Sequence, residues 1–422
     1  VPAYESGNSS DPMSSYVADD FFGMLDDTEG NWDNVPGRLD VGIGRLPVKT
    51  PGEAEAAVNK IIRYAAIPET IENENFCSDK TCHGLGDWRN SVCFAADDED
   101  GAEHLTQADI LATKINNAHH QLNINKIYFD AYQQVATPGG ERYPDATAAF
   151  MRQMDKGALI VNYTGHGGEY GWAHERFLET YHINSWKNKC RLPLFLTATC
   201  SFGRWDNPSL TSAGELTFLN AEGGAIGLIT ATRTVNSGGN FLLNNYFYDY
   251  VFKSLPDGKK PRMGDLNMLT KNSMYPTDIN ERCFSFLGDP ALMLSYPKHN
   301  VVTTKINGAV INTLQPDTVN ALSLVTIHGE VHDSSNKLLS NFNGILFPTV
   351  YDKQAKITTL GNNESSSIIT FVLQKNILFK GKAKVTNGQF VFSFIVPKDI
   401  AYNFGKGKIS YYAHNGYDDA SG

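Results

Sequence analysis

The sequence predicts an α/β protein in which a parallel sheet with helices on both faces is followed by an immunoglobulin-like β-sandwich. Four apolar runs of strand length show little alternation, which is typical of strands buried on both faces of a parallel sheet. Amphipathic helical segments lie between these runs, so the order is that of βαβ units. After residue 297 the helical periodicity disappears and short β-like runs recur.

The helices of the first part are marked by caps and apolar stripes. Thr50-Pro51-Gly52-Glu53 forms a capping box and predicts the start of a first helix. The stripe of apolar side chains that follows, as far as Ile62, is predicted to be the buried face of this helix. We predict a second helix at about 105–119 and a third at about 145–155, which Gly157 ends. The predicted strands are Ser91 to Ala96, Ile124 to Ala131, Ala158 to Thr164 and Leu192 to Thr199.

Reactive side chains follow three of these strands. Asp97, His166 and Cys200 each come just after a strand-like run, and the carboxyl ends of parallel strands meet at one edge of a sheet. A free thiol has a pKa of ~8.5 and needs a neighbouring base to become a good nucleophile. We therefore predict Cys200 as nucleophile, His166 as general base and Asp97 as the carboxylate that orients the imidazole. Backbone N–H groups of Gly167 and Cys200 are the predicted oxyanion donors.

Spacing alone leaves two ordinary structural readings open. A cysteine that ends a buried strand is often a small core residue. A histidine before two glycines can also serve only to close a turn.

The length of the chain limits the number of domains, and its charge argues against some classes of partner. A chain of 422 residues is long enough for two or three domains. Its formal net charge of −10 and pI of about 5.6 argue against nucleic acid as the main partner. No apolar run reaches 18 residues, so we expect no membrane-spanning segment. The sequence does not start with a signal peptide, so we expect it to be an internal piece of a longer protein.

Two further segments suggest a disulfide and a calcium site. Cys77 and Cys82 lie in a polar stretch, where a local disulfide is expected if the protein is secreted. Asp26, Asp27 and Asp33 offer hard oxygen ligands for a structural calcium ion, although a solvated loop is the more common explanation of such a segment. No cofactor is expected to be required for catalysis. The remaining cysteines, in apolar contexts, are predicted buried thiols: Cys93, Cys190 and Cys283.

The last part of the chain carries about seven short β-like runs in about 125 residues. This density suggests an immunoglobulin-like sandwich, although the usual Cys-Trp-Cys pattern is absent. Asn387-Gly388 between two such runs predicts a type I′ hairpin, with Phe390, Phe392 and Phe394 on one face.

Four ordered motifs resemble those of the gingipains, the C25 cysteine peptidases with a caspase-like sheet. They are Asn162 to Glu169 with Trp172 beyond it, Thr197 to Cys200, Cys93 to Asp97, and Phe286 to Leu292. The similarity spans about residues 1–297. It implies a triad of Cys200, His166 and Asp97.

This resemblance also implies a domain division and substrate contacts. Residues 1–70 would end a first αβ subdomain, 71–297 would form the catalytic subdomain, and 298–422 the β-rich region. Trp172 is implied near the substrate. His104 aligns where the arginine-specific members carry the acid that binds a basic side chain, so small or neutral residues before the cleaved bond are expected.

Within the family the chain is most similar to the gingipain-like sortases of the type IX secretion system. This implies a protein on the outer face of the outer membrane that removes the C-terminal sorting domain of exported cargo. It also implies transfer of the new carboxyl end to an amine of anionic lipopolysaccharide, and contact with an outer-membrane β-barrel and other surface subunits of the system. Two alternatives stay open: a general gingipain-like surface endopeptidase, and a non-catalytic surface or adhesion protein.

Overall fold

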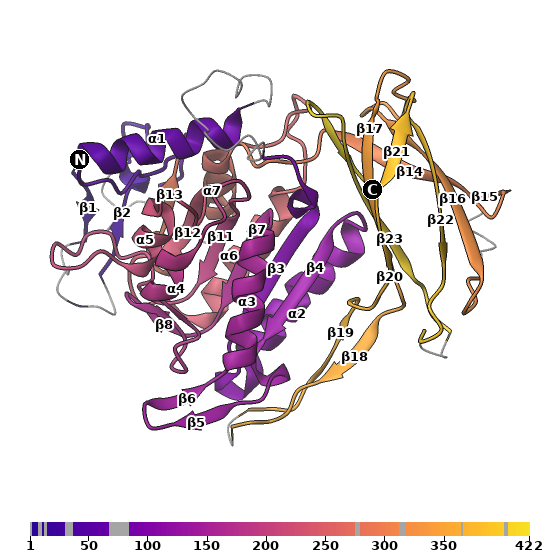
Figure 1. Ribbon diagram of the computed structural model, residues 1–422. Helices are drawn as coiled ribbons and strands as arrows, with labels where there is room; N and C mark the ends of the chain where they lie inside the picture. The colour runs from indigo at the N-terminus through magenta and orange to yellow at the C-terminus, as the bar shows by residue number, and fades with distance from the viewer. Residues whose placement is uncertain are drawn as a thin grey trace.

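A six-stranded sheet forms the centre of the computed structural model (Figure 1). The spatial order of its strands is β13-β12-β11-β7-β3-β4. All of them are parallel to one another except β13, which pairs antiparallel with β12. The strands are β3 (Ser91–Ala96), β4 (Asn123–Tyr128), β7 (Ile160–Thr164), β11 (Leu194–Ala198), β12 (Gly227–Ala231) and β13 (Phe284–Gly288). The described residues are 2–6, 11, 15–29, 37–66, 84–274, 279–311, 318–363, 366–400 and 404–422. The predicted α/β fold with a parallel sheet is confirmed, and β13 adds an antiparallel strand at one edge.

Helices cover both faces of this sheet, as the side chains of β3 show, because they are all buried and point alternately to the two faces. Phe94 faces a core cluster shared with α2, α6 and α7, whereas Cys93 and Ala95 face a second cluster shared with α1, α3, α4 and α5. Burial on both faces explains why the strand lacks polar alternation. The helices are α1 (Pro51–Ala65), α2 (Glu99–Ala118), α3 (Pro144–Lys156), α4 (Thr180–Ser185), α5 (Ala213–Leu219), α6 (Ser237–Tyr250), α7 (Met263–Asn272) and α8 (Ile279–Arg282).

The ends of the predicted helices follow the signals in the sequence, with one exception. Thr50 and Glu53 form both halves of the capping box of α1, and Gly157 ends α3 with a φ of 80°. The exception is the start of α2, where a kink at Asp100 to Ala102 separates Glu99 from the regular helix that begins close to the predicted position.

Small elements surround the main sheet. A three-stranded sheet, β10-β9-β8, follows the histidine strand β7, and two short pairs, β1–β2 and β5–β6, lie at the periphery. These strands are β1 (Tyr4–Glu5), β2 (Val17–Ala18), β5 (Val135–Thr137), β6 (Gly140–Arg142), β8 (Gly167–Gly168), β9 (Gly171–Trp172) and β10 (Leu178–Glu179). Short 3-10 helices cover Asp20–Gly23, Asp87–Asn90 and Phe129–Ala131.

The β-rich region stands beside the β4 edge of the main sheet (Figure 1). It forms one nine-stranded sheet that closes on itself, because β14 pairs with both β16 and β24. The predicted hairpin joins β21 to β22 through Asn387 and Gly388, both at positive φ, and all three phenylalanines are buried. The strands are β14 (His299–Ile306), β15 (Ala309–Val310), β16 (Leu324–His332), β17 (Gly344–Tyr351), β20 (Ile377–Lys380), β21 (Ala383–Thr386), β22 (Gln389–Ile395), β23 (Lys408–His414) and β24 (Asp419–Ser421).

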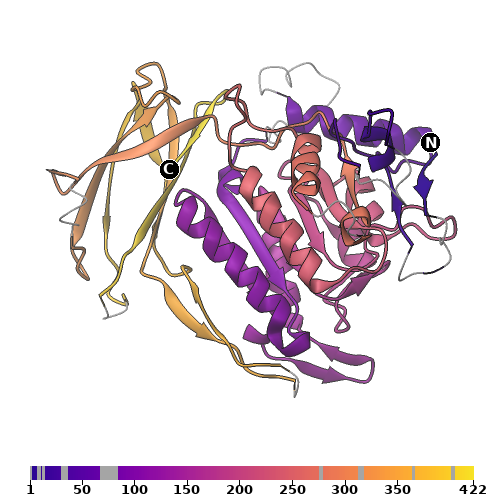
Figure 2. The same ribbon diagram turned by 180° about the vertical axis from the view of Figure 1, so that it is seen from behind.

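A long hairpin leaves this region and runs along the α/β part of the molecule. It consists of β18 (Ala355–Thr358) and β19 (Thr370–Leu373), and Figure 2 shows it from behind, next to α2. Phe371 packs its ring against Tyr128 of β4, with the centroids 4.8 Å apart. The β-rich region therefore contacts the central sheet through this hairpin as well as through the strands that stand beside β4.

The cysteines differ in their surroundings. Cys93 and Cys283 are buried, as predicted, and burial raises the pKa of Cys93 to about 12. Cys190 is disulfide-bonded, which corrects the prediction of a buried thiol there. Cys77 and Cys82 lie outside the described residues. In the described ranges, no helix combines the length and apolar character that crossing a membrane requires.

Candidate active site

The strand register brings the three predicted residues to one edge of the sheet. Thr164 of β7 lies opposite both Ala198 of β11 and Ala96 of β3, so His166 and Cys200 each follow their strand by two residues. The Asp97 N–H donates to the Thr164 carbonyl at 3.1 Å. Adjacent strand ends thus carry a thiol, an imidazole and a carboxylate.

The loop after His166 presses against the cysteine strand. A Cβ added to Gly167 would lie 2.5 Å from the Thr199 hydroxyl oxygen and 2.9 Å from the Gly171 carbonyl oxygen. Only glycine fits there without a shift of its neighbours. The close approach places the Gly167 backbone beside the residue that precedes Cys200; its role as an oxyanion donor stays a prediction.

The thiol of Cys200 is partly exposed, unlike those of Cys93 and Cys283. Its Sγ contacts the Val235 carbonyl oxygen at 3.6 Å. Ser201 turns the chain away from the strand with a φ of 50°, an uncommon conformation for a residue with a side chain. The Cys200 side chain therefore lies at a sharp turn with access to solvent.

Asp97 contacts the backbone of His166 and not its imidazole. The carboxylate is fully buried; Oδ2 accepts the His166 N–H at 2.9 Å, and Oδ1 accepts the N–H groups of Asp98 at 2.7 Å and Glu99 at 3.2 Å. The predicted orientation of the imidazole by Asp97 stays a prediction, and the contact that the structure shows is with the backbone N–H of His166. Asp97 fixes the two loops that carry the imidazole and its acidic neighbours.

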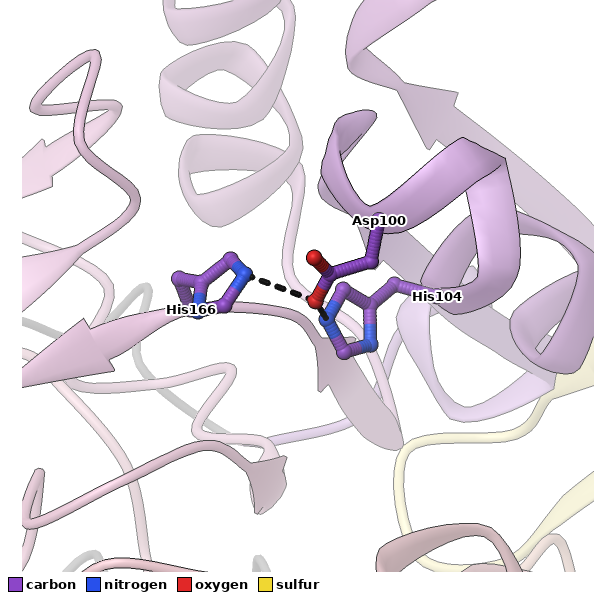
Figure 3. A group of neighbouring side chains, drawn as sticks. All are labelled: Asp100, His104 and His166. Carbon is purple, nitrogen blue, oxygen red and sulfur yellow. Dashed lines mark hydrogen bonds and ion pairs between the residues drawn. The ribbon is translucent and has the colours of Figure 1, made fainter. Parts of the chain in front are cut away.

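The imidazole of His166 faces two other carboxylates. Nε2 lies 3.0 Å from Asp100 Oδ2 (Figure 3) and 3.4 Å from Glu99 Oε2. His104 approaches the same Asp100 oxygen at 3.4 Å and meets the His166 ring edge to face. On the other side the His174 ring stacks on His166, and a hydrogen bond to Glu99 raises the pKa of His174.

Backbone conformation explains why Asp100 reaches this place. Asp100, Gly101 and Ala102 have φ values of 54°, 67° and 66°, so the start of α2 is a left-handed turn. The sequence reasoning did not predict a contact between Asp100 and His166. The dipeptide Asp100-Gly101 is a turn signal that could have been used.

A buried acidic cluster lies next to Asp97. Carboxylate oxygens of Asp97, Asp98 and Glu175 lie within 4.8 Å of one another. Burial, followed by the charge of Asp97, raises the pKa of Glu175 to about 8. Burial also raises the pKa of Asp98 to about 6, against a hydrogen bond from Tyr143 that lowers it. Sequence reasoning did not find Glu175, because nothing local marks it as buried.

The β18–β19 hairpin holds the same acidic loop from outside. Asn363 donates to Asp98 Oδ2 at 2.7 Å and the Ser366 hydroxyl donates to the Asp98 carbonyl at 2.8 Å. The N–H groups of Gly361 and Asn362 donate to the carboxylate of Asp130. A segment of the β-rich region thus completes the surroundings of the site.

Two predicted substrate contacts are not where they were expected. Trp172 is fully buried and stacks on Tyr163 with centroids 4.1 Å apart, so it belongs to the core and the prediction was wrong. His104 is 6% exposed and turns toward Asp100, which leaves little of it for a substrate.

The predicted calcium ligands lie far from this chemistry in the sequence. Asp26 and Asp27 are exposed, and Asp33 lies outside the described residues. Calcium binding there stays a prediction.

Comparisons with known proteins agree with this architecture. The family model for peptidase family C25 matches residues 1–295. The complex of Porphyromonas gingivalis RgpB pro- and mature domains is 15% identical, with 96% of this chain and 80% of that chain covered and a TM-score of 0.51. A structure of the Arg-specific cysteine proteinase gingipain R gives the same identity and TM-score, with 96% and 79% covered. These likenesses show the fold.

One longer structure also matches. Dimeric latent PorU from Porphyromonas gingivalis is 24% identical over 100% of this chain and 32% of that chain, with a TM-score of 0.34. No curated protein sequence matches the chain significantly.

Proposed function

Because the chain belongs to peptidase family C25 and is a cysteine peptidase, we propose that Cys200 is its nucleophile and His166 its general base. The register of β7 and β11 is the observation that carries this proposal, since it sets both residues two positions beyond paired strand ends. Cys200 is also partly exposed, whereas the thiols of Cys93 and Cys283 are buried. A nucleophile needs that access and an adjacent base.

The proposed reaction proceeds through an acyl-enzyme. The Cys200 thiol gives its proton to the His166 imidazole, and the thiolate attacks the scissile carbonyl carbon. The tetrahedral intermediate collapses to a thioester as the peptide nitrogen leaves with the proton from His166. Water or an amine then attacks the thioester, gives its proton to His166, and releases the new acid or amide together with the free thiol.

The imidazole has to exchange partners for this step. Its Nε2 contacts Asp100, while the Sγ of Cys200 contacts the Val235 carbonyl. Asp100 is 56% exposed, so it has room to move away when substrate arrives. Catalytic hydrogen bonds commonly tighten only in the substrate complex.

The substrates we propose are exported cargo proteins with a C-terminal sorting domain. Cleavage before that domain would leave the cargo as a thioester on Cys200, and an amine of anionic lipopolysaccharide would accept it. This choice is supported by the departure at His104, which stands where the arginine-specific members of the family carry an acid. In this role the protein works on the outer face of the outer membrane, beside the β-barrel and surface subunits of the secretion system.

Product mass spectrometry tests the proposal. A cargo peptide that ends in a sorting domain is incubated with the protein and a candidate glycan amine. An amide between the cargo and the amine supports sorting, and a free carboxylate as the sole product supports a general surface endopeptidase. A thiol-reactive peptide probe that leaves Cys200 unlabelled would support a non-catalytic surface protein.

A further inference from the structure

Three potential metal ligands converge at the edge of the site. Asp100, His104 and His166 each place one ligand atom within 4.8 Å of the other two. Figure 3 shows both imidazoles turned toward the Asp100 carboxylate from opposite sides. Two residues come from the start of α2 and the third from the end of β7.

The distances fit one ion bound between them. In a tetrahedral zinc site, bonds of about 2.1 Å separate neighbouring ligand atoms by about 3.4 Å. Asp100 Oδ2 lies 3.0 Å from His166 Nε2 and 3.4 Å from His104 Nε2. Small side-chain movements would suffice to form the site. Two imidazoles and one carboxylate favour zinc over magnesium or calcium, which prefer oxygen ligands.

His104 provides a second, independent observation. It is 6% exposed, and neither ring nitrogen has a hydrogen-bond partner. A buried imidazole without a partner is unfavourable. Nε2 points at the Asp100 oxygen that His166 also contacts. An ion at this point would satisfy the Nε2 lone pair.

We propose that Asp100, His104 and His166 bind a zinc ion, and that zinc bound there inhibits the peptidase. Zinc would take the Nε2 lone pair of His166, and any proton on that nitrogen would be released to solvent. The imidazole could then no longer accept the Cys200 proton at Nε2. Water, or Glu99 Oε2 at 3.4 Å from His166 Nε2, would fill the fourth position. The inhibition rests on the proposed role of His166, whereas the binding does not.

Binding is tested first on the Cys200→Ala protein, in which neither catalysis nor a thiolate ligand contributes. Calorimetric titration with zinc chloride should show one site, and cobalt should give the absorption of a tetrahedral site without sulfur. His104→Gln and Asp100→Asn should each weaken binding at least ~10-fold, since even the loss of outer-shell partners costs about 10–100-fold. His174→Gln is the matched control, because its ring stacks on His166 outside the ligand set; its affinity should not change.

Inhibition is then measured on the active protein, with each variant compared with its own zinc-free rate. The inhibition constant should equal the dissociation constant and should rise at least ~10-fold in His104→Gln. No binding to Cys200→Ala, or equal affinity in His104→Gln and Asp100→Asn, would overturn the site. Binding without a fall in rate would overturn the inhibition. Because His104 is buried, thermal unfolding is used to check that the His104→Gln protein is folded. If it is not folded, Asp100→Asn, which changes an exposed residue, tests the zinc site instead. A chain without peptidase activity still gives the binding result, so failure of the proposed function is seen separately.

Discussion

Nε2 of His166 lies 3.0 Å from Oδ2 of Asp100, although the two residues are 66 positions apart in the chain. The contact gives the imidazole a partner while the thiol of Cys200 rests against a backbone carbonyl. The proposed nucleophile and the proposed base therefore have separate partners in the structure. Substrate binding would have to bring them together.

The first prediction concerns the two reacting residues. Cys200→Ala and His166→Ala should each lower kcat/KM at least ~10³-fold, because either change removes the nucleophile or its base. Both are measured by peptide hydrolysis, with circular dichroism to show that the fold is kept. Near-normal turnover in either folded variant would contradict the assignment.

The second prediction concerns Asp97 and distinguishes a role in stabilising the loops from a direct role at the imidazole of His166. Asp97→Asn should lower the free energy of unfolding by about 1–3 kcal/mol, because a buried carboxylate that accepts three N–H groups is replaced by an amide. Activity should fall by less than in His166→Ala. Urea denaturation and kcat/KM are measured on the same samples. An unchanged unfolding midpoint with activity as low as in His166→Ala would assign Asp97 to the ring instead.

The third prediction concerns pH and Glu175. Its pKa rises from an ordinary 4.5 to about 8 in the fold, mainly through burial. Between these values the folded protein keeps a proton that the unfolded chain has lost, so this group lowers stability as pH rises from about 4.5 to about 8. Glu175→Gln carries no charge and should raise the free energy of unfolding at pH 8 more than at pH 5.

Urea denaturation over this pH range measures the difference. Exposed Glu141→Gln is the control and should leave the pH profile unchanged. A parallel shift of the whole profile in Glu175→Gln would mean that Glu175 is not the titrating group.

The fourth prediction concerns the hairpin. Asn363→Ala removes a donor from the buried Asp98 carboxylate and should destabilise the protein by about 1–3 kcal/mol. The acidic loop should loosen as well, so kcat/KM should fall. Thr358→Ala changes an exposed hydroxyl on the same hairpin and should have a smaller effect on both. Equal effects of the two changes would show that Asn363 acts only through general hairpin stability.

The sequence predicted the parts of this structure that depend on local patterns. Strand ends placed Asp97, His166 and Cys200 at one edge, and Asn387-Gly388 marked a hairpin. The approach of Asp100 was not predicted, because it depends on three successive residues in the left-handed conformation, which is rare for residues such as Ala102.

Long-range contacts were the other part that escaped sequence reasoning. The hairpin contacts with Asp130 join residues more than 230 positions apart. Trp172 was misplaced for a similar reason, since its ring also packs against Phe195 and Phe202, which come later in the chain.

The hairpin contact with Asp98 has a consequence for how related chains can diverge. Asn363 and Ser366 supply donors that the catalytic half does not provide for itself. A chimera that takes its β-rich region from another protein would lose these donors even if every strand folded. Asn362, Asn363 and Ser366 should therefore change together in evolution with Asp98 and Asp130, as one inherited unit that crosses the boundary between the two halves.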